Sequence, residues 1–192
     1  MLGQLIYSMD LIMVRNILQD DEMVATYKVG SLIITQLMIL PSIIQKTLFV
    51  ELAKMEKNKH LLLNYVYSYL KIAGPITITI ALFLYVFSDT LILAMYGDEY
   101  KVSSQILRIC ILSMIMSFLS LKPFSGLLMA LGKSNWNVLN ASFTAIINYV
   151  LNVIYIEQYG IVGAAYATVI SFSVSGVLSI LLFTIYIKKY CS

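Results

Sequence analysis

The chain is organised as six long apolar runs separated by short polar stretches. The runs cover residues 2–18, 24–49, 62–87, 104–131, 138–156 and 161–187. Hydrophobic residues make up 60% of the 192 residues and charged residues only 12%, too little charge for the surface of a water-soluble domain. Because about 20 apolar residues form one helix across a bilayer, the pattern predicts an all-α membrane protein. The predicted architecture is one bundle of six transmembrane helices over residues 1–192.

These runs contain few side chains that support catalysis. The sequence shows no nucleophile–base pair, phosphate loop or metal-ligand cluster, so we expect no enzyme activity, no cofactor and no metal centre. Cys110 and Cys191 lie far apart, which indicates neither a disulfide framework nor a metal site. The net charge of +3 comes from scattered basic residues rather than a long basic block, which argues against a nucleic-acid partner.

The loops between the runs alternate in charge. Lysines follow the second run (Lys54, Lys57, Lys59), the fourth run (Lys133) and the sixth run (Lys188, Lys189). Acidic residues dominate the other loops (Asp20, Asp21, Glu22, Asp89, Asp98, Glu99, Glu157). The positive-inside rule then predicts a multi-pass protein with both termini in the cytoplasm. Tyr27, Tyr190 and Trp136 are among the aromatic residues near run ends, a position typical of interfacial belts.

The fifth run contains a regular polar pattern. Asn140, Thr144, Asn148 and Asn152 recur every four residues, so a helix places them on one face. An unpaired amide is costly in hydrocarbon, so this face must contact protein or water. Two interpretations remain open: hydrogen bonds between helices, or one wall of a substrate cavity.

The sixth run contains small residues with the same spacing. Gly163, Ala167, Ser171 and Ser175 also share one helix face. Small side chains let two helix backbones approach closely, so this face predicts a tight helix–helix contact.

A few charged residues lie inside the runs. Asp10 is an intramembrane acid, which is a hypothesis for a proton or sodium site, or for one member of a charge pair. Arg108 and Lys122 share a helix face in the fourth run, and Lys71 lies in the third. These basic residues either extend to the nearer membrane surface or form a cationic lining for a phosphate-bearing substrate.

Several stretches resemble one known family. They are residues 152–156 (NVIYI), 159–171 (YGIVGAAYATVIS), 97–100 (GDEY), 106–109 (ILRI) and 9–13 (MDLIM). The chain is similar to the C-terminal half of bacterial polysaccharide flippases, the O-antigen and capsule exporters of the multidrug/oligosaccharidyl-lipid/polysaccharide (MATE-like) superfamily. The chain departs from the family pattern in two places. A proline is common shortly before the Tyr159–Gly160 pair, where this chain has Glu157 and Gln158, and Arg15 stands where glycine is common.

The resemblance implies half of a transporter with twelve to fourteen helices in two bundles. Alternating access would carry a lipid-linked oligosaccharide, a polyprenyl-pyrophosphate sugar repeat unit, across the bacterial cytoplasmic membrane. Arg108, Lys122 and Lys71 would contact the pyrophosphate, and the polar residues of the fifth run would contact sugar. Asp10 would couple an ion. The implied partners are membrane lipids, the missing N-terminal bundle or a second copy, and polysaccharide polymerases or glycosyltransferases.

Two other functions fit the same residues. A MATE-type drug/cation antiporter would depend on Asp10 and leave Arg108 without a role. The other is a membrane protein that does not transport, such as a scaffold for a glycan-synthesis complex or a truncated remnant.

Overall fold

The computed structural model describes residues 2–41, 43, 51–54 and 58–191, and no strand occurs in these ranges. The principal helices are α1 (Leu2–Leu18), α2 (Asp21–Leu37), α4 (Lys59–Tyr96), α5 (Ser103–Met116), α6 (Lys122–Ala130), α7 (Ser134–Tyr159) and α8 (Ile161–Tyr190). Two short elements, η1 (Asp98–Tyr100) and η2 (Ser117–Leu121), lie before α5 and between α5 and α6. The prediction of an all-α membrane protein is confirmed.

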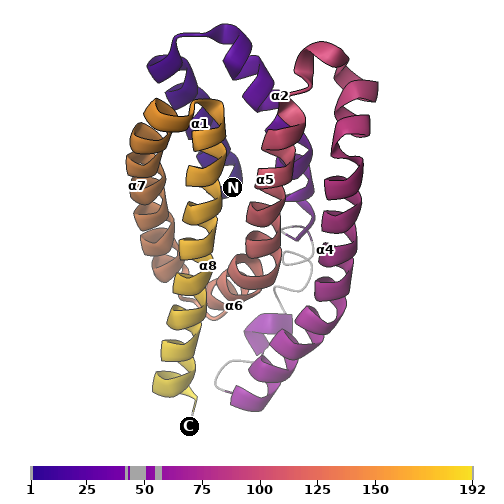
Figure 1. The fold of residues 1–192 in the computed structure, drawn as a ribbon. Helices are drawn as coiled ribbons and strands as arrows, with labels where there is room; N and C mark the ends of the chain where they lie inside the picture. The colour runs from indigo at the N-terminus through magenta and orange to yellow at the C-terminus, as the bar shows by residue number, and fades with distance from the viewer. Residues whose placement is uncertain (1, 42, 44–50, 55–57, 192) are drawn as a thin grey trace.

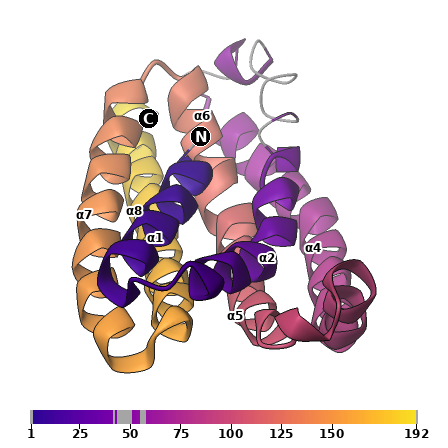
Figure 2. The same cartoon turned by 90° about the horizontal axis from the view of Figure 1, so that it is seen from above.

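Successive helices run up and down through the bundle (Figure 1). Helix α8 contacts α7, α5, α6 and α1, so it lies at the centre of the packing. Seen from above, α1 and α2 lie side by side between α7 and α4 (Figure 2), and these two helices also pack against each other. This arrangement places α1 and α2 together on one side of the bundle.

Four segments of the described chain are long and apolar enough to cross a membrane. They are Lys59–Tyr96, Ser103–Ala130, Ser134–Tyr159 and Ile161–Tyr190. Helices α1 and α2 have 17 residues each, shorter than a typical spanning helix. The second predicted run continues to residue 49, and residues 44–50 lie outside the described part. Six spans in one bundle therefore remain a prediction.

The fourth predicted run forms an interrupted helix. Helix α5 passes into η2, a single π-helical segment, before α6 begins. Pro123 has no backbone N–H and disturbs the regular i→i−4 ladder, so the break before it has a local cause. Here η2 lies against α8, where a Cβ on Gly176 would come within 2.1 Å of Ser120 Oγ.

Helices α7 and α8 are joined by a tight turn at Gly160. Its φ of 59° lies in the left-handed region that favours glycine. Beyond the turn the backbones are in close contact, because a Cβ on Gly163 would lie 1.9 Å from the carbonyl oxygen of Tyr155. Ala167, Ser171 and Ser175 are also buried on α8, where the sequence predicts a close helix–helix contact.

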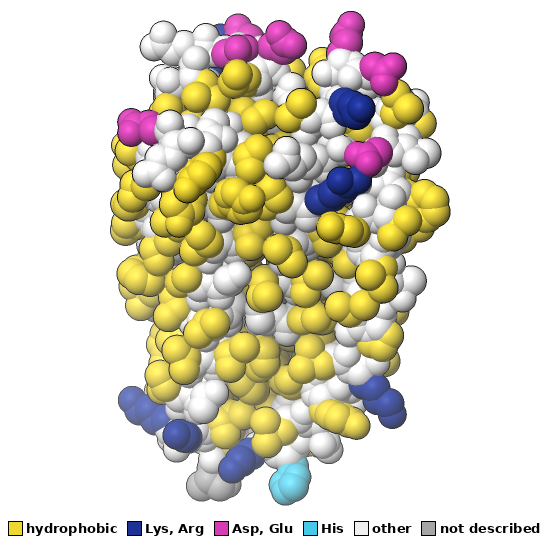
Figure 3. Space-filling view, in the orientation of Figure 1, with side chains coloured by type: hydrophobic (Ala, Val, Ile, Leu, Met, Phe, Trp, Pro, Cys, Tyr) yellow, Lys and Arg dark blue, Asp and Glu magenta, His cyan; other side chains and the backbone are white. Residues whose placement is uncertain are grey.

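Opposite charges gather at the two ends of the molecule (Figure 3). Acidic residues lie in or next to the α1–α2, α4–α5 and α7–α8 connections: Asp20, Asp21, Glu22, Asp89, Asp98, Glu99 and Glu157. The start of α4, the α6–α7 connection and the end of α8 contain lysines, and we call this the lysine end. An apolar surface separates the two ends, as expected for a protein whose middle contacts lipid (Figure 3).

Candidate functional site

The bundle encloses a carboxylic acid that four helices surround. Asp10, on α1, is completely buried. The hydroxyl groups of Tyr27 on α2 (2.8 Å) and Thr168 on α8 donate to its Oδ2. The side-chain amides of Asn148 (3.1 Å) and Asn152 (2.7 Å) on α7 donate to its Oδ1. We call these five side chains the Asp10 centre, and they join α1, α2, α7 and α8 through one carboxyl group.

No basic group pairs with this acid in the part of the chain that the structure describes. The two ion pairs found there are Arg15–Asp21 and Arg108–Asp89, and neither includes Asp10. A buried carboxylate is costly unless a charge or strong hydrogen bonds compensate it. The four donors supply hydrogen bonds but no positive charge. A proton or a small cation at the carboxyl group would complete the compensation.

The Asp10 centre contains the kinds of oxygen atom that hard cations bind, but its amide N–H and hydroxyl O–H groups point at the carboxylate. Its side chains offer carboxylate, amide and hydroxyl oxygens, the ligands that hard cations prefer. The Oδ1 atom of Asn152 is buried and has no hydrogen-bond partner. Among the described residues, no three His, Cys, Asp or Glu side chains cluster as a metal site. A proton on the Asp10 carboxyl group would remove the buried charge while leaving oxygen atoms for the surrounding donors.

The polar residues of α7 face inward rather than toward a cavity. All four predicted members are buried. The Asn140 amide donates to the Ser175 carbonyl (3.0 Å) and to Ser179 Oγ (2.9 Å), both on α8. Thr144 donates to the Asn140 carbonyl at 2.7 Å. Together with Asn148 and Asn152 in the Asp10 centre, these residues form hydrogen bonds inside the bundle, which is one of the two sequence interpretations.

The exposed surface of α7 is apolar instead. Its exposed large side chains include Val138, Leu139, Phe143, Ile146 and Tyr149. A helix with this distribution has its polar side in protein and its apolar side in lipid.

The exposed side of helix α1 is mixed rather than apolar, because polar side chains lie there beside the exposed Leu5 and Ile12. Gln4, Ser8, Arg15 and Gln19 are exposed and recur at helical spacing on one side. Ile6 and Val14 are completely buried on the other. Lipid is a poor neighbour for such polar side chains, so this side of α1 indicates water or another polar surface.

Helix α2 extends this polar surface. Lys28 and Gln36 are exposed on α2, which packs beside α1. Arg15, Asn16 and Gln19 line a shallow hollow of about 300 Å³ together with Asp21, whose Oδ1 lies 3.4 Å from Arg15 Nε. We call the exposed polar side chains of the two helices the α1–α2 polar face. They are Gln4, Ser8, Arg15, Asn16, Gln19, Lys28 and Gln36.

Sequence reasoning missed this surface because the residues lie in two short helices. The helical spacing of Gln4, Ser8, Arg15 and Gln19 in the first run is the signal that would have predicted a polar face. Tyr27, expected in an interfacial belt, is instead completely buried against Asp10.

The predicted cationic residues lie apart from the Asp10 centre. Arg108 donates through Nη2 to Asp89 (2.5 Å) and through Nε to Ser88 Oγ (2.6 Å). Its guanidinium is therefore paired with an acid on α4. Lys71 is exposed on α4, and Lys122 is half-buried where α6 begins. The structure does not bring these three residues together into one anion site.

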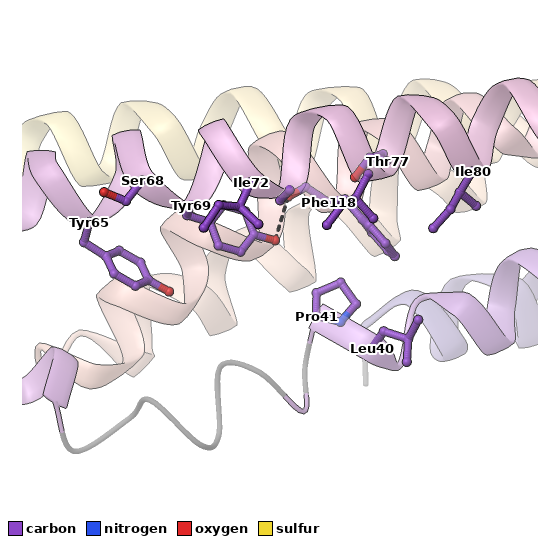
Figure 4. A pocket seen from close by; sticks show the side chains of 11 residues that line it. Leu40, Pro41, Tyr65, Ser68, Tyr69, Ile72, Thr77, Ile80 and Phe118 are labelled. Carbon is purple, nitrogen blue, oxygen red and sulfur yellow. Dashed lines mark hydrogen bonds between the residues drawn. The ribbon is translucent and has the colours of Figure 1, made fainter.

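An apolar groove of about 370 Å³ lies between α4, η2 and the residues that follow α2 (Figure 4). Leu40 and Pro41 face Ile72, Ile80 and other α4 side chains across it. The Tyr69 hydroxyl donates to the Phe118 carbonyl at 3.1 Å, so the phenol of this lining residue is already bonded. Hydrocarbon fits such a groove, whereas a sugar would leave most of its hydroxyls without partners.

Comparisons with known proteins place these features in context. A family model described as "Polysaccharide biosynthesis protein" matches residues 1–105, which include α1, α2 and α4. The probable low-salt glycan biosynthesis flippase Agl15 of Haloferax volcanii is 36% identical over 94 residues. That match covers 48% of this chain but only 20% of the relative. No solved structure matches the chain significantly.

Proposed function

Because this chain belongs to the family of polysaccharide biosynthesis proteins, we propose that it helps to move a lipid-linked oligosaccharide across a membrane. The similarity to a probable glycan biosynthesis flippase supports transport as the role. The proposed mechanism is alternating access, in which a polar path opens first to one side of the membrane and then to the other.

The α1–α2 polar face is the observation that carries this proposal. Helices α4 and α7 expose mostly apolar side chains, as lipid requires. The α1–α2 polar face instead offers amide and hydroxyl groups that suit sugar hydroxyls. Lys28 adds exposed positive charge near the acidic end. Arg15 adds an exposed guanidinium whose Nε lies 3.4 Å from Asp21, and a pyrophosphate would have to compete with this acid for it. We therefore assign the polar path to this face rather than to α7 or Arg108.

The apolar groove suits the lipid part of the same substrate. It begins beside the end of α2, so it neighbours the helix that bears Lys28 and Gln36. A polyprenyl chain in the groove would keep hydrocarbon out of the polar path. Its charged head group would then contact the α1–α2 polar face.

Ion binding at the Asp10 centre provides a means of coupling. Helix α1 bears Asp10 on its buried side and Arg15 on its exposed side. A proton or cation at Asp10 changes the strength of the bonds that hold α1 against α7 and α8. A change in the position of α1 would then alter the polar path on its other side.

The α1–α2 polar face can form a path that excludes lipid only if a second protein surface covers it. We propose that another helix bundle faces the α1–α2 polar face, either from a further part of the same protein or from a second copy. The lysine end would lie in the cytoplasm, following the positive-inside rule. Location in a bacterial cytoplasmic membrane and contact with polysaccharide polymerases or glycosyltransferases remain predictions.

Replacing the two exposed cations of the polar face tests the proposal. The double variant Arg15→Gln/Lys28→Gln, made in the protein in its native host, should strongly reduce surface glycan without loss of membrane-inserted protein. Lys71→Gln combined with Lys59→Gln is the matched control, because both lysines are exposed on α4 and outside the polar face. Normal glycan display in Arg15→Gln/Lys28→Gln, at normal protein level, would contradict the assignment.

A cation-coupled drug antiporter is the second candidate, and the Asp10 centre is the observation that favours it. Such a protein would need the buried acid but no cationic surface for a pyrophosphate. Export of a cationic dye from membrane vesicles, driven by a proton or sodium gradient, distinguishes the two. Dye export that depends on Asp10 but not on Arg15 and Lys28 would favour the antiporter.

A further inference from the structure

A second group of charged and aromatic side chains lies at the lysine end, outside the proposed path. Lys133 Nζ lies 4.3 Å from the ring centroid of Tyr190 and 6.0 Å from that of Trp136. Lys189 Nζ lies 5.6 Å from the same Tyr190 centroid. Tyr190 in turn stacks on Tyr186, with ring centroids 5.1 Å apart. We call Lys133, Trp136, Lys189 and Tyr190 the lysine–aromatic cluster.

The positive charges of this cluster are not neutralised by an acid within the described ranges. Both ion pairs found there lie elsewhere, at Arg15–Asp21 and Arg108–Asp89. The two ammonium groups contact one ring and therefore lie within about 10 Å of each other. Two like charges at this separation repel, and a shared anion would relieve the repulsion.

The position of the cluster indicates what kind of anion it meets. It lies where α6 turns into α7 and where α8 ends, at one end of three membrane-length segments. Trp136 and Tyr190 are half-buried, as aromatic residues at a lipid head-group layer commonly are. The N-terminus of α7 follows Lys133 and has no side-chain cap. The Trp136 N–H already donates to the Lys133 carbonyl (3.0 Å), and the N–H groups of the two residues before it add donors to the same region.

We propose that the lysine–aromatic cluster binds the phosphate head group of an anionic phospholipid. Lys133 and Lys189 hold the phosphate between them, and the rings of Trp136 and Tyr190 lie along the glycerol and upper acyl region. This site is separate from the polar path, so it fixes the α6–α7 turn and the end of α8 to the membrane surface. Each lysine near an anionic surface strengthens attraction about five-fold.

The chain provides its own probe, because Trp136 is its single tryptophan. The full chain is reconstituted in phosphatidylcholine vesicles that contain equal mole fractions of either brominated phosphatidylglycerol or brominated phosphatidylcholine. Bromine quenches tryptophan fluorescence on contact. We expect the anionic lipid to quench Trp136 several-fold more efficiently. Equal quenching by the two lipids would overturn the proposal.

A matched pair of variants separates a local site from general charge attraction. Lys133→Gln/Lys189→Gln should abolish the preference for the anionic lipid. Lys54→Gln/Lys59→Gln removes the same amount of charge from two other exposed lysines, which follow the second apolar run. This control variant should keep the preference for the anionic lipid. If both double variants lose the preference equally, the cluster is not a site. Lys133→Arg/Lys189→Arg should retain quenching, and it keeps the test decisive if the glutamine variant fails to fold.

A final arm distinguishes a lipid head group from free phosphate. Inorganic phosphate, compared with sodium chloride at the same ionic strength, should not remove the preference of the wild-type chain for brominated phosphatidylglycerol. If inorganic phosphate removes it selectively, the cluster binds free phosphate and the lipid assignment is wrong. None of these measurements requires transport, so they stand or fall independently of the proposed function.

Discussion

Removing the carboxyl group of Asp10 should loosen the packing of four helices. In Asp10→Ala, the donors on Tyr27, Asn148, Asn152 and Thr168 lose their shared acceptor inside the bundle. An interhelical hydrogen bond in a membrane protein contributes about 0.6 kcal/mol on average, and an unsatisfied buried donor costs about 1 kcal/mol or more. Four such losses predict a destabilisation of roughly 2–4 kcal/mol.

Asp10→Asn has nearly the same shape and should cost far less. Its carbonyl oxygen still accepts from Asn148 and Asn152. Its amide group can donate to the hydroxyl oxygens of Tyr27 and Thr168, because a hydroxyl group both donates and accepts. We expect a loss below about 1 kcal/mol, because all four contacts keep a hydrogen-bonding partner. The same variant removes the carboxyl group, which is the group in the centre that can take up a proton or carry a negative charge near neutral pH.

Thermal unfolding of the purified full chain in detergent, followed by circular dichroism, measures the difference. The expected order of Tm is wild type, Asp10→Asn close below, and Asp10→Ala clearly lowest. A cation that binds the centre should raise the Tm of the wild type but not that of Asp10→Asn. Equal losses for both variants would refute the hydrogen-bond reasoning, because they would show that the negative charge itself holds the helices together.

Two further predictions concern helix contacts. Gly163→Ala should lower the Tm strongly, because its Cβ would lie 1.9 Å from the Tyr155 carbonyl oxygen. The control Gly74→Ala should change the Tm little, because no atom lies within 4 Å of a Cβ there. Similar losses of Tm in the two variants would contradict the close contact between α7 and α8. Arg108→Gln should lower the Tm slightly, because it removes the bonds that join α5 to Asp89 and Ser88 on α4. In a double-mutant cycle with Asp89→Asn, a coupling energy near zero would show that the ion pair does not stabilise the α4–α5 contact.

The local pattern of the sequence predicts much of the helical structure. The length of the apolar runs predicts helices. The break around Gly160 predicts where α7 ends and where α8 begins. The four-residue spacing of Asn140 to Asn152 correctly predicts one shared face. These features depend on neighbours within a few turns, so one segment of sequence contains the information.

The partners of those faces could not be predicted in the same way. Asp10 and Asn148 are separated by 138 positions, and Asp10 and Thr168 by 158. No local sequence pattern predicts that these residues contact each other, because the contact depends on how α1 packs against α7 and α8. The same limit applies to Arg108, whose acid partner on α4 lies 19 residues away across a turn.

Helix α1 shows why the direction of a face matters for function. At 100° per residue, Asp10 lies roughly on the opposite side of α1 from Gln4, Ser8 and Arg15. The structure buries the first side in the bundle and exposes the second. One rigid helix therefore connects an ionisable group to a polar surface, without a longer chain of contacts between them. Because the two sides cannot move independently, any movement of α1 that follows a change in the bonds of Asp10 also moves the polar face, and this linkage is what ion-driven transport requires.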